Sequence, residues 1–382
     1  MTGARWAPVA AQQTAVRASS SFNTLPLLLL AALATATPAV AESTLQVAGE
    51  LNLSLAHYRG HQEAGGLHTQ TRLDSYGSRL TLRGTEALGG SLKASFTLAS
   101  SLGPDDGRGR FCSRDCWVAL SGDFGMLKLG RLLPIYDDVS VPWYFIETPG
   151  THNPLALWAN CGGGAGLESG CLDNYLPGSL RYDTPRVSGW SASASASRVE
   201  DVPEPGRAAK VYTLGGDYRD AGWYMGYAAQ IQDDARGAGL RDTGFTVSLL
   251  YKGPLTLGLG YEHLRYKMAG GETLRRDYLG LLLARYTGPH ATWFNLGRAG
   301  SGHGDAARGA TVNAVSQLPR SGAWMWSVGQ HYKISPTVKL YGFYTEIRNE
   351  PHGAYALDAA SAKWLGRGRR LSTWALGYIV RF

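Results

Sequence analysis

Residues 76–131 decide the fold, and they read YGSRLTLRGTEALGGSLKASFTLASSLGPDDGRGRFCSRDCWVALSGDFGMLKLGR. In the first segment Arg79 and Arg83 alternate with leucines, and beyond a Gly-Gly turn Lys93 and its polar neighbours alternate with apolar residues. Alternation with period two predicts strands that have one apolar face and one wet face. Because a soluble sandwich would exclude arginine and lysine from its core, the stretch predicts a membrane barrel around a water-filled lumen.

The composition suits one large barrel. The chain has 382 residues, of which 50 are glycine, 20 are tyrosine and only 18% are charged. Glycine for turns, tyrosine for interfacial girdles and a moderate polar content are typical of membrane barrels. The net charge is +7, but the basic residues are dispersed and match no known module, so nucleic acid is not an expected partner.

The N-terminal segment has the pattern of a secretory signal. Arg5 and Arg17 precede an apolar run at residues 25–33, and the segment ends in Pro-Ala-Val-Ala at residues 38–41. A basic region, a short apolar core and an A-x-A end predict a cleaved signal peptide. We place it at residues 1–41, which leaves the barrel over residues 42–382.

The rest of the chain continues the alternation in about sixteen strands of roughly ten residues, the length that a tilted strand needs to cross a bilayer. Short turns and long loops alternate, and both chain ends fall on the short-turn side. A polar segment at residues 59–70 joins the first strand to the opening stretch. A water-soluble propeller would show a blade-length repeat, which the sequence lacks. The expected fold is an all-β, antiparallel transmembrane β-barrel, whose closure removes exposed edges.

Residues 132–178 show no sustained period, so they are expected to form one long irregular connection. The segment contains Asp137, Asp138 and Glu147 together with several aromatic residues. A structureless run of this length is usually functional or disordered, and its aromatic residues and cysteines argue against disorder.

The four cysteines fit an exported protein with two disulfides. Counting leaves three pairings open. In an extended strand Cys112 and Cys116 would lie about 13 Å apart, so they can bond only if the chain turns between them. We favour Cys161–Cys171 within residues 132–178 and Cys112–Cys116 as a second, tight bridge. The spacings match no common zinc site, so no metal is expected.

Several motifs spread along the chain carry a family resemblance. YGSRLTLRGTEALGGSLKASFTL, SRDCWVALSGDFGMLKLGR, SLRYDTPRVSGWSASAS, YKISPTVKLYGFYTEIRN and the terminal GYIVRF resemble, in this order, landmarks of the general porins of Gram-negative outer membranes, in their betaproteobacterial-type branch. The resemblance implies a sixteen-stranded barrel, usually a homotrimer, whose third external loop folds into the lumen as a constriction. By position this loop is residues 132–178. The chain departs from the pattern in its longer third loop with cysteines, and in Ala48-Gly49 and Asn52 of the first strand.

The resemblance also implies a channel for passive diffusion of ions and small hydrophilic solutes. We expect a pore constriction in which basic wall residues face acids of the third loop, so that the field across the narrow lumen steers ions. The alternative is that these are ordinary solvated lumen residues. The wall residues are Arg79, Arg83, Lys93, Arg114 and Lys128, and the loop acids are Asp137, Asp138 and Glu147.

Further expectations concern partners. The C-terminal Tyr378, Val380 and Phe382 resemble the signal that the barrel-assembly machinery reads. The surroundings would be outer-membrane lipid and lipopolysaccharide, and no cofactor is expected. No nucleophile and base can be paired, so we do not expect an enzyme. An adhesin or receptor that acts through its external loops is the alternative function.

Overall fold

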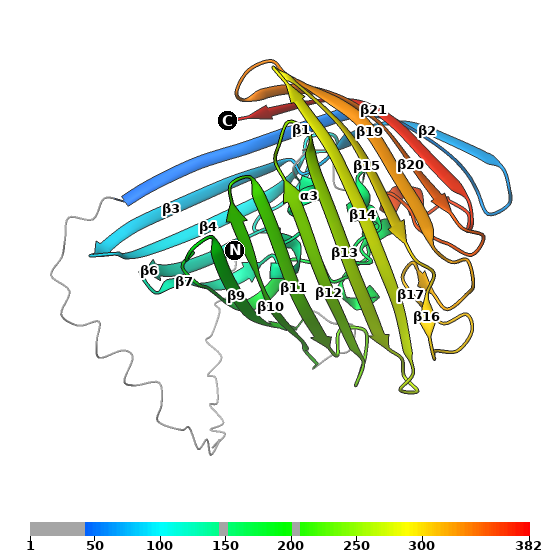
Figure 1. Ribbon diagram of the computed structural model, residues 1–382, viewed down its shortest axis with the longest axis horizontal. Helices are drawn as coiled ribbons and strands as arrows, with labels where there is room; N and C mark the ends of the chain where they lie inside the picture. Colours follow the sequence, from blue (N-terminus) through cyan, green and yellow to red (C-terminus); the bar gives the residue numbers. More distant parts are fainter. Residues whose placement is uncertain (1–42, 145–151, 201–206) are drawn as a thin grey trace, which may run out of the picture. The chain divides into compact units, whose positions relative to one another are not determined.

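The alternating segments form one continuous antiparallel sheet in the computed structural model (Figure 1), which describes residues 43–144, 152–200 and 207–382. The expected signal peptide lies outside the described residues. The wall strands are β1 (Ser43–His61), β2 (Leu67–Ser75), β3 (Arg79–Gly89), β4 (Leu92–Gly103), β6 (Cys116–Gly122), β7 (Gly125–Leu132), β8 (Leu176–Asp183), β9 (Trp190–Val199), β10 (Ala209–Asp220), β11 (Trp223–Asp233), β12 (Arg241–Tyr251), β13 (Thr256–Lys267), β14 (Thr273–Thr287), β15 (His290–Ala299), β19 (Ala323–Lys333), β20 (Val338–Asn349) and β21 (Arg370–Arg381).

The sheet closes on itself at β1 and β21. Residues 50–60 of β1 pair with β21, and the other edge of β1 pairs with β3 over residues 43–50 and with β2 over residues 53–61. Strands β2 and β3 therefore share one position in the wall, which makes a barrel of 16 strands. The expected fold class is confirmed.

Alternation along each strand separates an apolar outside from a filled inside. In β13, Leu257, Leu259 and Tyr261 are exposed, while Glu262 and Tyr266 are fully buried. The outward residues meet lipid in a membrane barrel, whereas the inward ones meet whatever fills the lumen.

Tryptophans at the barrel surface lie near strand ends. Trp190, Trp223, Trp324 and Trp374 are each roughly half exposed, which suits amphipathic rings at a membrane interface. Trp293 differs because only 2% of it is exposed, and its ring lies against His331.

The connections contain the remaining elements. Helices α2 (Ile135–Asp138), α3 (Val141–Tyr144), η3 (Pro154–Ala156), η4 (Gly162–Gly164) and η5 (Leu167–Ser169) lie in the third loop, and α4 (Ala359–Ala362) lies before the last strand. Short strands β5 (Arg108–Arg110), β16 (His303–Gly304), β17 (Thr311–Val312) and β18 (Val315–Ser316) lie in other loops. No helix in the described ranges is long and apolar enough to cross a membrane.

The polar segment at residues 59–70 differs from expectation. It belongs mostly to β1 and β2, and only residues 62–66 connect the two strands. Strand β2 has threonines at two of its outward positions, Thr69 and Thr71. Its two faces therefore differ little in hydrophobicity, and the alternation that predicts a strand is weak there.

Candidate functional site

The third loop folds into the barrel and packs against the inner surface of the wall. Its helices α2 and α3 contact β10 to β13, and in Figure 1 they lie behind these strands. Ile135, Tyr136 and Trp143 of these helices are buried. Two wall glutamines hold the end of the loop, because Gln230 donates to the carbonyl of Leu172 (2.8 Å) and Gln232 to that of Cys171 (3.0 Å). The loop therefore occupies part of the lumen.

A buried ion pair on the wall fixes the middle of the loop. Glu262 of β13 and Arg276 of β14 are adjacent, and both side chains are 0% exposed. Arg276 also donates to the carbonyl of Leu157, while Glu262 accepts from the Tyr136 hydroxyl (2.9 Å) and the Ala159 N–H (2.9 Å). Because a buried charge is costly without partners, the pair and these loop groups satisfy one another. We name these two wall residues the loop latch.

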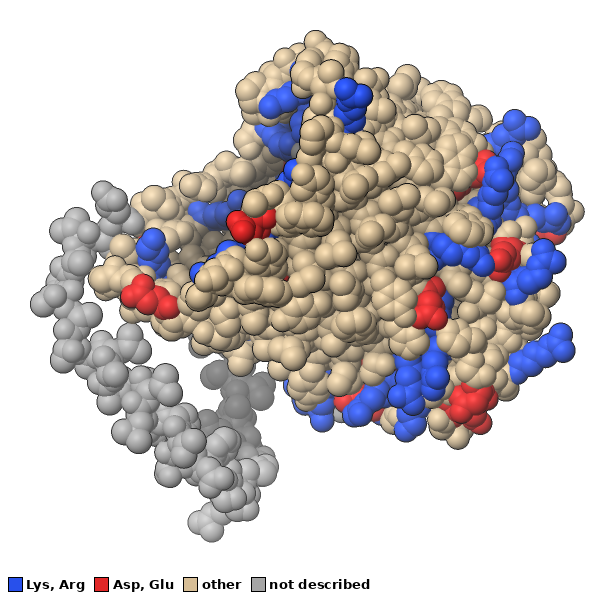
Figure 2. Space-filling view, in the orientation of Figure 1, with Lys and Arg blue, Asp and Glu red and all other residues tan. Residues whose placement is uncertain are grey.

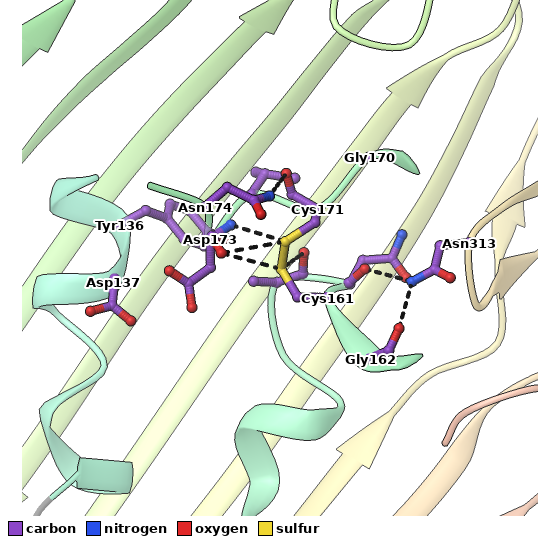
Figure 3. Close-up of a disulfide and its surroundings, with 12 residues drawn as sticks. Tyr136, Asp137, Cys161, Gly162, Gly170, Cys171, Asp173, Asn174 and Asn313 are labelled. Carbon is purple, nitrogen blue, oxygen red and sulfur yellow. Dashed lines mark hydrogen bonds between the residues drawn. A yellow bond between two sulfur atoms is a disulfide. The ribbon is translucent and has the colours of Figure 1, made fainter. Parts of the chain in front are cut away.

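A disulfide closes the loop beside the latch. Cys161 and Cys171 are bonded, with their Cα atoms 4.7 Å apart, and the Asp173 N–H donates to the Cys171 sulfur (3.4 Å) (Figure 3). Asn313 of the loop after β15 donates to the carbonyl of Asn160 (2.7 Å), which ties two external loops together. The disulfide thus restrains a loop segment that the loop after β15 also holds through this hydrogen bond.

The second disulfide joins Cys112 to Cys116, with a Cα separation of 5.3 Å. The chain turns at Cys112, where φ is +53°, and enters β6 at Cys116. The turn provides the short separation that an extended strand would not allow.

A cavity of about 650 Å³ lies between the infolded loop and the opposite wall. Its wall side carries polar and charged groups from β1, β3, β21 and the loop before β6, namely Glu50, Asn52, Arg79, Arg114 and Arg381. Its loop side is formed by the third loop and the last external loop, among them Tyr144, Cys161, Gly162, Asp173 and Asp358. A polar opening with wall cations facing loop carboxylates is the arrangement that steers ions in channels.

Carboxylates offset some of the wall cations. Glu50 accepts from Arg79 (3.2 Å) and from Arg381 (2.7 Å). Farther along the wall, Asp183 pairs with Lys128 (2.8 Å) and with Arg181 (2.7 Å). Because each of these cations is paired with a carboxylate, its positive charge is partly offset. The four cations therefore contribute less to the electric field in the lumen than their number suggests.

Three of the expected wall cations, Arg83, Lys93 and Arg114, make no ion pair with any described residue. Strand alternation places Arg83 and Lys93 on the same side as the buried Thr81 and Thr97, so they face the lumen, but they do not line the cavity. Arg114 does line the cavity, and its guanidinium lies 5.4 Å from the centre of the Tyr175 ring. Arg114 is therefore the wall cation with the least local neutralisation at this opening.

The expected loop acids occupy different environments. Asp137 is 7% exposed, accepts from the Tyr144 hydroxyl (2.7 Å) and does not line the cavity. Burial, together with the nearby Asp173 carboxyl, raises the pKa of Asp137 well above its ordinary value. Asp138 pairs with Arg181 of β8 (2.6 Å). Glu147 lies outside the described residues.

Sequence reasoning missed Asp173 and Arg381, which both line the cavity. Burial raises the pKa of Asp173 to about 6, so this carboxyl titrates close to neutral pH. Asp173 follows Cys171 by two residues, and this closeness to the expected disulfide is a usable signal. Arg381 lies in the terminal motif, whose interpretation as an assembly signal left no reason to place it in the lumen.

The proposed assembly residues lie at the outer surface of the closing strand. Tyr378 and Phe382 are 43% and 59% exposed. The backbone of Phe382 exchanges two hydrogen bonds with Gly49, at 2.9 and 3.1 Å. A Cβ atom on Gly49 would lie 2.2 Å from the Phe382 ring, so glycine is required for this contact.

Comparisons with known proteins agree with this architecture. The chain is 32% identical to outer membrane porin protein 32 of Delftia acidovorans, over 44% of this chain and 47% of that protein. It is 28% identical to major outer membrane protein P.IB of Neisseria meningitidis serogroup B, over 53% and 56%. The chain thus spans about half the length of these curated relatives.

Solved structures share the fold. The anion-selective porin from Comamonas acidovorans superposes with a TM-score of 0.68 at 21% identity, covering 89% of this chain and 100% of that one. OmpF of Salmonella typhi, solved in complex with daunomycin, gives 0.61 at 14% identity, over 88% and 97%. The model of the Gram-negative porin family matches residues 28–352. This chain, with its closed barrel and infolded loop, therefore belongs to the Gram-negative porin family.

Proposed function

We propose that this protein is an outer-membrane porin, a water-filled channel through which ions and small hydrophilic solutes diffuse passively. The observation that carries the proposal is the polar cavity of about 650 Å³ that remains between the infolded loop and the wall. A sixteen-stranded barrel leaves a wide lumen, and a loop held inside it narrows that lumen to a selective opening.

We further propose that the channel prefers anions. The wall acids Glu50 and Asp183 are each shared by two cations, whereas Arg83, Lys93 and Arg114 have no ion-paired carboxylate among the described residues. The excess positive charge lies in a confined space, where it raises the local concentration of anions. The Comamonas acidovorans protein, an anion-selective porin of the same fold, supports this preference by analogy.

The constriction in this proposal differs slightly from the one that the sequence alone suggests. Arg79 and Arg114 provide the wall charge at the opening, with Arg83, Lys93 and Lys128 contributing along the approach. Asp173 is the loop acid nearest to the solute path, because it lines the cavity while Asp137 is enclosed. Asp138 contributes weakly because Arg181 offsets it.

We infer the remaining context from the family. The protein is exported by a signal at residues 1–41, inserted by the barrel-assembly machinery and surrounded by lipid and lipopolysaccharide. A homotrimer is the proposed assembly, and a Vibrio cholerae relative in fold, OmpT, has been solved in a trimer form at 12% identity and a TM-score of 0.60.

Single-channel recording tests the proposal. Purified protein in a planar bilayer should give stepwise conductance, and a tenfold KCl gradient should give a reversal potential of the sign for chloride preference. Deleting the centre of the third loop should raise conductance and reduce selectivity. A folded barrel that conducts no ions would contradict the channel and favour the adhesin or receptor function.

A further inference from the structure

The last external loop, between β20 and β21, lies at the same cavity as the third loop. Its residues Leu357, Asp358 and Ala359 line the cavity. Leu357 and the nearby Tyr355 are each only 1% exposed, so this part of the loop is packed in place. If it were displaced it would enter water, because charged side chains of both signs gather at the long-loop end of the barrel while the middle of the outer face is uncharged (Figure 2).

The second half of this loop is fixed to the connection between β1 and β2. The Gly366 N–H donates to the carbonyl of His61 (2.9 Å). The Trp364 ring lies 4.3 Å from the ring of His68, measured between centres. The loop is therefore attached to the wall beyond α4.

The first half is attached to the wall through the residue that caps α4. One carboxylate oxygen of Asp358 accepts from the Ser361 N–H (2.7 Å) and so satisfies the first turn of the helix. The other oxygen accepts from the Arg72 guanidinium of β2, which also pairs with Asp74. A single side chain thus fixes both the start of α4 and its place on the wall.

The α4 helix itself rests on three consecutive glycines of the third loop, Gly162–Gly164, which form η4. A Cβ atom on Gly164 would lie 2.9 Å from the Cβ of Ala359, and one on Gly163 would lie 3.2 Å from the Cβ of Ala362. A side chain at these positions would therefore push α4 away. We name Gly162–Gly164 the glycine platform.

The third-loop disulfide encloses the glycine platform. Cys161 directly precedes the platform, and its bond to Cys171 closes the segment in which the platform lies (Figure 3). Two of the three glycines have φ values of +73° and +77°, and such a run has too much conformational freedom to hold its shape alone. The disulfide removes part of this freedom, and Asn313 donates to the carbonyl of Gly162 (3.2 Å). The cysteines that set this chain apart from the family pattern therefore restrain the surface on which the last loop rests.

We propose that α4 is a second constriction element of the pore, and that the disulfide-closed glycine platform sets its position and hence the largest solute that passes. The wall side of the cavity is fixed by strands, so its width depends on the two loops opposite. Cys161, Cys171 and Asp358 are positioning residues in this arrangement. The inference rests on the proposed function, because it needs an open channel.

The test measures single-channel conductance of the purified full-length barrel and the largest polyethylene glycol that still lowers this conductance by entering the pore. Replacing residues 357–362 by a Gly-Ser run of the same length removes α4. Conductance should rise about twofold, as expected if one of two elements that narrow the lumen is withdrawn, and larger polymers should enter. Cys161→Ala/Cys171→Ala should change both quantities in the same direction but less, because the other attachments of α4 remain.

Combining the two changes separates the platform from the rest of the third loop. If the disulfide acts by positioning α4, then its removal should add little once α4 is gone. An equal rise in the size limit with and without α4 would show that the disulfide acts on the third loop alone, which would overturn the role of the platform.

A carboxylate variant tests the attachment without removing the helix. Asp358→Asn keeps a good helix cap but loses the charge pair with Arg72, so the size limit should rise and the current should become noisier. The matched control is Glu350→Gln, in the same loop, which breaks a pair with Arg298 (2.6 Å) away from the cavity and should change neither quantity.

Folding of each variant is checked by heat-modifiable mobility on gels. A conducting barrel whose size limit is unchanged in Asp358→Asn and in Cys161→Ala/Cys171→Ala would overturn this inference, even if the α4 replacement did not fold. A folded wild-type barrel without conductance would instead overturn the proposed function. The two failures are therefore distinguishable.

Discussion

Arg114 is the residue at which the selectivity proposal is most sharply tested. It lines the cavity and makes no ion pair with a described residue, whereas Arg79 shares Glu50 with Arg381. Arg114→Gln should lower the anion-to-cation permeability ratio roughly two- to fourfold at 0.1 M salt, from one unit charge about 5 Å from the ion path in water. Reversal potentials in a KCl gradient measure this change.

Arg198→Gln is the control for Arg114, because Arg198 lies on β9 with its exposed side chain paired to Glu200 (3.4 Å). It should leave the reversal potential where it is. A similar shift in both variants would mean that total charge, rather than charge at the cavity, sets selectivity.

Asp173 should make the channel depend on pH. Burial raises its pKa from 3.8 to about 6, so it is mostly charged at pH 7.5 and mostly neutral at pH 5. The wild type should therefore be more anion-selective at pH 5 than at pH 7.5. Asp173→Asn should remove most of this change, as reversal potentials at the two pH values would reveal. A pH response of normal size in the variant would assign the titration to another group.

The same group links stability to pH. The folded state holds the Asp173 proton more tightly than the unfolded chain does, because the folded pKa is raised. Its contribution to stability is complete below about pH 4 and is lost as the pH rises through 6. Thermal unfolding of wild type and Asp173→Asn at pH 5 and 7.5 should show a smaller loss in the variant over that interval.

At this scale two residues named from the sequence lie at the cavity, and their part in a constriction stays a prediction. Arg79 and Arg114 belong to motifs that carry the family resemblance, and both line the cavity. Asp137 could not be separated from Asp173 by sequence, because only folding decides which carboxyl is enclosed beside Tyr144. Burial of a side chain inside an irregular loop leaves no periodic pattern in the sequence from which it could be predicted.

Among the elements, the third loop depends most on the loop latch. Glu262→Leu would leave the Arg276 guanidinium buried without its carboxylate, which costs about 3–5 kcal/mol. Thermal unfolding should therefore move to lower temperature. Conductance should rise and become noisier, since Tyr136 and Ala159 would lose their acceptor.

A double variant separates the effect on the stability of the protein from the effect on the position of the third loop. Glu262→Leu/Arg276→Leu removes both charges, and apolar replacement of a buried ion pair is often neutral for stability. It should recover much of the unfolding temperature but keep the raised conductance, because the loop remains unlatched. Glu200→Gln, which breaks an exposed pair, should change neither measurement. Normal conductance in the double variant would show that the disulfide and the wall glutamines suffice to hold the loop.

Strands were the part of the fold that sequence predicted best. Their alternation follows directly from apolar lipid outside and polar groups inside, so it is strong wherever that contrast is strong. Strand β2 was missed because Thr69 and Thr71 weaken the contrast. The path of the third loop inside the lumen followed only from the family resemblance, since the glutamines, the latch and Asn313 that hold it lie far away in sequence.

At the scale of the whole molecule, the barrel closes where β1 pairs with β21. Phe382 directly follows β21, exchanges hydrogen bonds with Gly49 of β1 and places its ring over that glycine. Deleting Phe382 should leave export intact and reduce the folded protein in the outer membrane severalfold, as heat-modifiable mobility on gels would measure. Phe382→Tyr, which keeps the ring, should accumulate normally. Normal amounts of folded protein after the deletion would contradict an assembly role.

The pairing of β1 with β21 also has a consequence for folding time. Glu50 and Arg381 meet across this seam although they are 331 positions apart in the chain. Bringing such distant segments together costs about 5 kcal/mol of chain entropy before any contact compensates for it. Hairpins between successive strands form with far smaller losses, so we expect the forming wall to pass through an open sheet whose two edges are β1 and β21. Until the seam forms, both edges can pair with another chain, and the survival of the protein depends on protecting them during that interval.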